Sequence, residues 1–152
     1  MSDCIRPFQE ADLPKLLEID RACFEPGIAY DHFVLDFFIR RILSVTLVLM
    51  VDSDIAGFGI AAPERMRGKI TGHIITLDLL PQARGKGYGR RLLQELESQL
   101  KKLGATDYGL EVDVRNAPAI AFYKKMSYRP ARKLRNYYGP GKDAWKMVRS
   151  AV

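Results

Sequence analysis

The sequence lacks most of the features that would point to a metal, a disulfide or a membrane. Its only cysteines are Cys4 and Cys23, whose spacing fits neither a disulfide framework nor a metal site, so we expect no metal. The longest uncharged run, residues 42–51, is too short to cross a bilayer, which takes about 20 residues. No signal-peptide pattern opens the chain. We therefore expect a cytoplasmic protein without membrane contact, in which Cys23 lies in the core.

Internal repeats, low-complexity tracts and linkers are also missing, so we expect residues 1–152 to form a single domain. The composition, 47% hydrophobic and 28% charged, is ordinary for a soluble globular protein. The net charge of +6 would permit an acidic ligand or a ribosomal neighbourhood. No basic tract alternates with aromatic residues, however, so we expect no direct binding to nucleic acid. The positive charge is better explained by the binding of an anionic cofactor.

Residues 73–100 contain the most informative pattern in the chain. An apolar strand ends at Pro81, glycines alternate at Gly85, Gly87 and Gly89, and leucines then recur at helical spacing. Glycine lets backbone N–H groups converge on one point, and the helix adds the positive end of its dipole. Four cationic side chains surround this loop: Arg84, Lys86, Arg90 and Arg91. The pattern predicts a diphosphate site, although a glycine-rich turn with solvated charges would look the same.

The rest of the chain alternates between strand and helix patterns. Periodicity and turn residues predict strands at residues 5–8, 45–51, 55–62, 108–114, 128–138 and 144–148, and a polar turn at 65–69. They predict helices at residues 12–24, 31–43 and 116–127, the last one capped by Asn116. The second helix has a richly apolar face, which we expect to pack in the core rather than to line a substrate site: Phe33, Val34, Phe37, Phe38 and Ile42.

Two motifs together resemble the GNAT superfamily of N-acetyltransferases. The first is Arg84-x-x-Gly87-x-Gly89 after Leu77-Asp-Leu-Leu-Pro81, and the second is Leu110-Glu-Val112 with Asn116 and Phe122-Tyr123. Further similarity to bacterial and archaeal ribosomal-protein alanine N-terminal acetyltransferases includes Gly72-His-Ile74, Arg135-Asn-Tyr-Tyr138, Asp143-Ala144 and Met147. The resemblance implies an α/β GNAT fold, with a mixed, mostly antiparallel sheet of about seven strands flanked by about four helices.

The same resemblance implies acetyl-CoA as the acetyl donor and assigns residue roles. Glu111 would be the general base through water, the Leu79 N–H would polarise the thioester carbonyl, and Tyr123 would protonate the departing thiolate. Asn116 would bind the pantetheine arm, which would lie between two splayed strands. The full set of cofactor-binding residues is Leu77, Leu79, Arg84, Gly85, Lys86, Gly87, Tyr88, Gly89, Arg90 and Asn116.

Proton energetics favour a protein N-terminus as the acceptor. An α-amine has a pKa of about 8, so neutralising it at pH 7 costs roughly 1.4 kcal/mol, whereas a lysine would cost roughly 4.6 kcal/mol. A single carboxylate as the base therefore suits an α-amine better than a lysine. A lysine or small-molecule acceptor stays open as an alternative, as does a non-catalytic acyl-CoA-binding module, and the sequence does not predict the oligomeric state.

Several candidate residues have a structural alternative. Glu111 could be an ion-paired strand residue and Tyr123 a packing aromatic. His73 could relay protons, but a structural role is favoured, and Tyr137 and Tyr138 could line the acceptor entrance or pack a hairpin. Asp78 stands where the resembled enzymes have a small neutral residue, so it either contacts a cationic acceptor or forms a structural ion pair. Residues 24–30 also lack the Trp-Ser element of the bacterial enzymes, in which that loop helps to select the acceptor.

Overall fold

The computed structural model describes residues 2–150, which form one seven-stranded sheet flanked by four α-helices. The strands are β1 (Asp3–Pro7), β2 (Val45–Val51), β3 (Asp54–Met66), β4 (Lys69–Leu79), β5 (Asp107–Asp113), β6 (Arg129–Leu134) and β7 (Ala144–Ser150). The helices are α1 (Leu13–Cys23), α2 (His32–Arg40), α3 (Tyr88–Lys102) and α4 (Ala117–Lys125). The strand order is β1-β2-β3-β4-β5-β7-β6, and only β4 and β5 pair in parallel. The expected mixed, mostly antiparallel sheet is confirmed.

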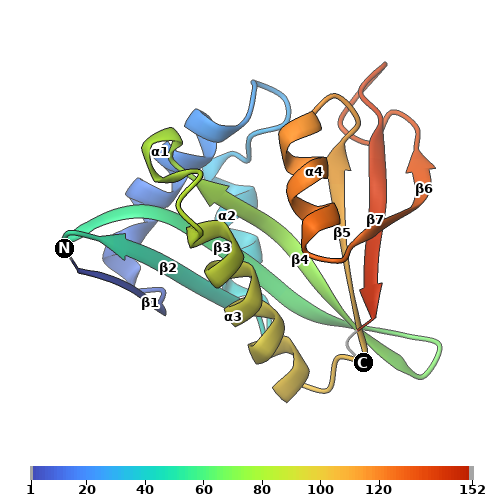
Figure 1. Ribbon diagram of the computed structural model, residues 1–152, viewed down its shortest axis with the longest axis horizontal. Coiled ribbons are helices and arrows are strands. Elements are labelled where there is room, and N and C mark those ends of the chain that lie inside the picture. The colour runs from blue at the N-terminus through green and yellow to red at the C-terminus, as the bar shows by residue number, and fades with distance from the viewer. Residues whose placement is uncertain (1, 151–152) are drawn as a thin grey trace.

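Helices cover both faces of the sheet and form two separate cores (Figure 1). The leucines of α3 pack with Tyr123 of α4 on one face. Leu16 and Ile19 of α1 pack with Leu35 of α2 on the other. Each helix buries one apolar side in this way, and the sheet between them is covered on both faces.

The strands β4 and β5 separate after a short paired stretch. Pairing is confined to Thr71–His73 with Asp107–Gly109, and the two strands then diverge toward their C-terminal ends, with α4 beside the upper part of β5 (Figure 1). A β-bulge in β4 skips Ile75, because Ile60 pairs with Thr76 while Ala61 pairs with Ile74. A bulge of this kind re-aims the side chains that follow it. The place where the two strands separate, next to the bulge, is called the opening below.

The structure differs from the sequence-based expectation most clearly in α2. Phe33 and Phe37 are 82% and 64% exposed, whereas Leu35 is buried and Phe38 packs against the α1 core. The expectation that the whole apolar face packs in the core was therefore wrong. This helix is apolar on nearly every side, so periodicity could not identify the buried side.

Element boundaries also differ in three places. The helix α2 ends at Arg40 rather than at residue 43, and β6 ends at Leu134 because residues 135–143 form a loop. The strand β3 continues to Met66, so the expected polar turn shrinks to Arg67 and Gly68, both with positive φ. No helix within residues 2–150 is long and apolar enough to span a membrane.

Candidate functional site

Glu111 lies on β5 beside the opening, and three side chains converge on its carboxylate. The Lys146 ammonium donates to Oε2 at 2.7 Å, His73 Nε2 lies 2.7 Å from Oε1, and the Tyr137 hydroxyl donates to Oε1 at 3.3 Å. The carboxylate side chain is only 11% exposed. The sheet register causes this arrangement, because Glu111 is the direct cross-strand partner of Lys146.

His73 extends this cluster into a row of alternating charges. Its second ring nitrogen, Nδ1, lies 3.0 Å from Glu64 Oε2, and Arg41 approaches the same oxygen at 3.3 Å. Both ring nitrogens therefore face carboxylates, which can only accept hydrogen bonds. An imidazole can donate from both nitrogens only when it is protonated. The row runs Arg41, Glu64, His73, Glu111, Lys146.

The pKa values of this row follow from its geometry. Burial alone would raise the pKa of Glu111, but the His73 hydrogen bond, together with Lys146, outweighs it and lowers that pKa to about 2. Burial alone would lower the pKa of His73, and the hydrogen bonds and charges of Glu111 and Glu64 outweigh it and raise that pKa. Glu111 is therefore a carboxylate throughout the physiological range, and the protonated form of His73 is stabilised between its two carboxylate partners.

Three tyrosines lie in the region of Glu111, and one of them, Tyr137, donates to its carboxylate. Tyr137 and Tyr138 lie in the β6–β7 loop with their rings edge to face at 4.9 Å, and the Tyr138 hydroxyl donates to the Glu111 carbonyl at 3.4 Å. Asn136 holds that loop, because its N–H donates to Asp143 and its side chain accepts from the Gly141 N–H. Tyr30 lies across from them in the α1–α2 loop, with its hydroxyl 3.5 Å from the Ile75 carbonyl at the bulge.

On the other side of the opening, α4 supplies Tyr123 and Asn116. Asn116 caps the helix by accepting a hydrogen bond from the Ala119 N–H at 3.2 Å, as expected, which leaves its amide NH₂ for another partner. Tyr123 is 9% exposed, and burial together with the charge of Asp78 raises its pKa. Its hydroxyl is therefore protonated at any physiological pH and can only donate a hydrogen bond to a nearby anion.

The glycine-rich loop precedes α3 in an open conformation. Gly85 and Gly87 have φ values of 73° and 84°, and a Cβ built on either would meet no atom within 4 Å. The first N–H groups of α3 face this space without intrahelical partners. Arg84 turns back to donate from Nε to the Leu79 carbonyl at 3.0 Å, and Arg91 pairs with Asp3 at 2.7 Å. Arg91 therefore does not surround the loop as the sequence suggested.

A comparison with known protein families identifies the chain. A family model described as the acetyltransferase (GNAT) family matches residues 13–128. The chain belongs to the GNAT acetyltransferase family. It is therefore an acyltransferase, and the resemblance inferred from the two motifs is confirmed.

Individual GNAT relatives match this chain over different lengths. An N-alpha-acetyltransferase from Sulfurisphaera tokodaii is 29% identical over 153 residues, covering 95% of this chain and 90% of that protein. The ribosomal protein bS18-alanine N-acetyltransferase of Escherichia coli is 41% identical over 58 residues, 38% of this chain and 39% of that protein. The crystal structure of Arabidopsis thaliana NAA60 in complex with acetyl-CoA has the same fold, with a TM-score of 0.84, 23% identity and 99% of each chain covered.

The GNAT fold brings most of the candidate residues to the one opening between β4 and β5. Leu77 and Leu79 lie on β4 before the loop, and both pack in the α3 core. Asp78, on the same strand, is 1% exposed and faces Asp20 of α1 instead of the opening. The sequence left an ion pair or a cationic acceptor open for Asp78. Within residues 2–150 no salt bridge to it is formed.

Three residues of the GNAT site were missed by sequence reasoning: Glu64, Lys146 and Tyr30. Lys146 gave a usable signal, since it is the one charged residue in the otherwise apolar stretch 144–148. Glu64 falls between the expected strand 55–62 and the expected turn 65–69, and Tyr30 falls in the loop after the first helix. Glu64 reaches His73 through the register of β3 with β4, and Tyr30 approaches through the α1–α2 loop, and no local pattern reports either.

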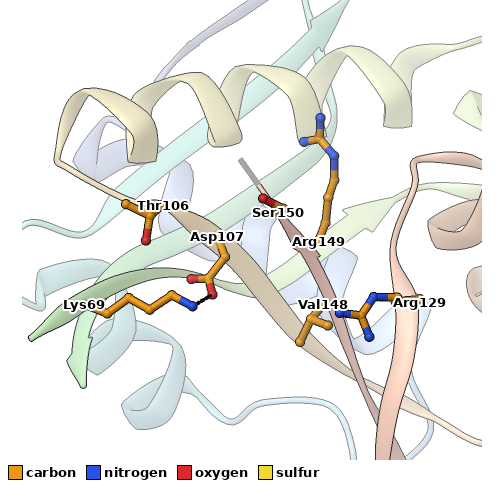
Figure 2. Close-up of a pocket in the computed structure, with 7 residues that line it drawn as sticks. All are labelled: Lys69, Thr106, Asp107, Arg129, Val148, Arg149 and Ser150. Atoms are coloured by element: carbon orange, nitrogen blue, oxygen red, sulfur yellow. Dashed lines mark ion pairs between the residues drawn. The ribbon is translucent and has the colours of Figure 1, made fainter. Parts of the chain in front are cut away.

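A separate hollow of about 200 Å³ lies away from Glu111 (Figure 2). It is lined at the start of β5 by Asp107, whose carboxylate pairs with Lys69 at 2.6 Å, and by Arg129 and Arg149. Asp107 precedes Glu111 by four residues, so the two are about 13 Å apart along the strand. Residues 2–150 contain no group of three or more His, Cys, Asp or Glu side chains that could hold a metal.

Proposed function

We propose that this GNAT enzyme transfers the acetyl group of acetyl-CoA to the α-amine at a protein N-terminus. The observation that supports this most strongly is the row His73–Glu111–Lys146 beside the β4–β5 opening. It offers a base matched to an α-amine and is enclosed by tyrosines on the acceptor side. The names of the relatives, an N-alpha-acetyltransferase and an alanine N-acetyltransferase, agree with this acceptor.

The proposed base is the pair His73–Glu111 rather than Glu111 alone. Moving a proton from an α-ammonium of pKa about 8 to a carboxylate of pKa about 2 costs about 8 kcal/mol. Moving it to a neutral imidazole of ordinary pKa about 6.5 costs about 2 kcal/mol, and less here because the pKa of His73 is raised. Glu111 lies between the acceptor side and His73, so it passes the proton inward through its Oε1.

Acetyl-CoA supplies the thioester, and the residues of the opening orient it. Gly85, Lys86, Gly87, Tyr88, Gly89 and Arg90 hold its diphosphate, together with Arg84. Asn116 binds the pantetheine arm through the amide NH₂ that capping leaves free. The Leu79 N–H polarises the carbonyl, and Leu77 supports that strand. The amine forms the new C–N bond, and the C–S bond breaks.

Tyr123 stabilises the departing thiolate by donating a hydrogen bond to its sulfur. A thiol has a pKa of about 8.5 and a tyrosine about 10, so complete proton transfer would cost at least about 2 kcal/mol before burial is counted. The raised pKa of Tyr123 makes it a reliable donor rather than a strong acid. Tyr137 and Tyr138 form the acceptor entrance, together with Tyr30.

The proposal also includes a cytoplasmic location for a single domain, residues 1–152, that acts without direct contact with nucleic acid or membrane. The free thiols of Cys4 and Cys23 fit a reducing compartment.

Measurement of CoA release tests this function. The substrates are acetyl-CoA with short peptides that begin with free Ala, Ser or Met, and matched N-terminally blocked peptides that contain lysine. We expect turnover only with free N-termini, and about 100-fold lower kcat in Glu111→Gln and in His73→Asn. Glu95→Gln, an exposed carboxylate on α3, is the matched control and retains activity. Turnover confined to blocked lysine peptides would refute the α-amine assignment.

A further inference from the structure

Two aspartates are buried side by side beneath the acceptor side of the opening. Asp20 of α1 and Asp78 of β4 are 0% and 1% exposed. One oxygen of each has a donor: the Tyr30 backbone N–H donates to Asp20 Oδ2 at 2.6 Å, and the Thr76 hydroxyl donates to Asp78 Oδ1. The proposed reaction uses neither carboxyl group.

The other oxygens of this pair have no donor. Asp20 Oδ1 and Asp78 Oδ2 are buried, and nothing within residues 2–150 donates a hydrogen bond to either. Burial raises the pKa of Asp78 well above its usual value, and the neighbouring Asp20 carboxyl raises it further. Two ionised carboxylates cannot remain in contact inside a core without a cation, because their repulsion adds to the cost of desolvation. A proton on one oxygen satisfies both.

The groups around the pair do not replace that proton. Arg84 is the nearby cation that lowers the pKa of Asp78, but its Nε donates to the Leu79 carbonyl. The Cys23 thiol has its own pKa raised to about 11, by burial and then by Asp78, so it is neutral. Tyr30 and Tyr123 also face the pair and are likewise neutral, since burial raises the pKa of each.

The pair is connected to the acceptor side through Tyr30. Its backbone is held by Asp20, its hydroxyl reaches the Ile75 carbonyl on the strand of Asp78, and its ring packs on Phe38 at 5.3 Å. The charge of Glu111 is among the causes that raise the pKa of Tyr30, so the two side chains share one region. Whatever fixes α1 against β4 at this point therefore fixes one wall of the acceptor entrance.

We propose that Asp20 and Asp78 hold a single proton between them and act as positioning residues that fix Tyr30 at the acceptor entrance. This inference rests on the proposed function for its catalytic consequence and on the buried geometry for the proton itself. When the proton is lost, the two carboxylates repel each other, α1 moves from β4, and the acceptor site loosens. Peptide binding should weaken, while the acetyl donor binds as before on the opposite side.

The direction of the pH dependence follows from the raised pKa of Asp78. Below the pKa of an unfolded aspartate, about 4, both states are protonated and the stabilising contribution is complete. As pH rises toward the folded-state pKa, the unfolded chain loses the proton first, so the unfolding equilibrium constant increases up to tenfold per pH unit from this group. Asparagine at position 78 keeps the shape and a donor without a titrating proton.

The first experiment detects the shared proton directly and needs no enzyme assay. Infrared spectra of the full chain at pH 7 should contain a protonated-carboxyl C=O band that disappears in Asp78→Asn and persists in the control Asp54→Asn, an exposed aspartate. Denaturant unfolding from pH 5 to 8 gives the free energy of unfolding as a function of pH. This free energy should fall less steeply with pH in Asp78→Asn than in the wild type, by the equivalent of one proton. An absent band, or equal slopes, overturns the shared proton.

The second experiment measures peptide kinetics. We expect Asp78→Ala to raise the peptide KM at least tenfold with little change in the acetyl-CoA KM, and Asp78→Asn to restore the peptide KM to within threefold of the wild type. An unchanged peptide KM in Asp78→Ala overturns the positioning role. If the wild type acetylates no peptide while the infrared band is present, the proposed function fails and the shared proton stands.

Discussion

Glu111 lies between the Lys146 ammonium and His73, and these two partners decide what its carboxylate can do. Both favour the charged form of the carboxylate, so Glu111 is a source of stability and a weak base, and in the proposed reaction it passes the proton on to His73. The sequence predicted that a carboxylate would act at this position. It did not predict the partners, because Lys146 and His73 come from two different neighbouring strands.

At this residue we predict a specific loss of acid stability. The pKa of Glu111 falls from 4.5 to about 2 on folding, so its contribution is present above pH 4.5 and is lost as pH falls toward 2. A shift of that size corresponds to about 3 kcal/mol. Denaturant unfolding at pH 5 and pH 3 should therefore show a smaller loss of stability on acidification in Glu111→Gln than in the wild type. Equal losses in both proteins would contradict the strong pairing.

The rate should depend on pH through His73. Only a neutral imidazole can take the proton from Glu111, so kcat/KM increases as pH rises through the raised pKa of His73. Glu64→Gln removes one of the two carboxylates that raise this pKa, and the acid limb of the pH–rate profile should move to lower pH. The measurement is kcat/KM for a free N-terminal peptide from pH 5 to 9. A limb that stays in place, or moves to higher pH, would exclude His73 as the proton acceptor.

At the scale of single elements, α2 presents adjacent phenylalanines with opposite environments. Phe38 packs on the α1 core, whereas Phe37 is mostly exposed. We predict that Phe38→Ser destabilises the protein by about 2 kcal/mol, because it removes a large, partly buried side chain from the α1 core, and that Phe37→Ser changes stability by less than about 1 kcal/mol. Chemical denaturation of the two variants makes the comparison. The reverse order would mean that α2 packs with its other side inward.

The glycine-rich loop allows a similar matched comparison. Gly87 and Gly68 have φ values of 84° and 75°, and a Cβ on either has open space around it, so alanine introduces backbone strain of about 1–2 kcal/mol without a clash. Both Gly87→Ala and Gly68→Ala should lower stability to a similar degree. Only Gly87→Ala should raise the KM for acetyl-CoA, since Gly68 lies in the β3–β4 turn. A raised KM in both variants would contradict the assignment of the loop.

The elements that local patterns could identify were predicted well. The strand, loop and α3 around Gly87, and the Asn116 cap of α4, follow from turn residues and periodicity, and the structure contains each of them. The buried side of α2 could not be predicted, because apolar side chains occupy most of the circumference of that helix. The partner of Asp78 could not be predicted either, since Asp20 lies on an early helix 58 positions away, and the sequence left Asp78 open between a cationic acceptor and a structural ion pair.

Over the whole molecule, the two faces of the sheet present different groups of the candidate residues. The α3 and α4 face presents the glycine loop, Tyr123 and Asn116, while the α1 and α2 face with the β6–β7 loop presents Tyr30, Tyr137 and Glu111. The divergence of β4 and β5 connects the two faces (Figure 1). In the proposed reaction, the acetyl donor occupies one side of that opening and the peptide N-terminus the other.

The most direct test of transfer to an α-amine uses one peptide with both a free N-terminal alanine and an internal lysine. After incubation with acetyl-CoA and the full-length enzyme at pH 7.5, fragmentation mass spectrometry locates the acetyl group. We predict that it lies on the α-amine, that the lysine ε-amine stays free, and that Glu111→Gln abolishes most of the product. An acetyl group found on the lysine, with the N-terminal amine unmodified, would contradict the proposed function.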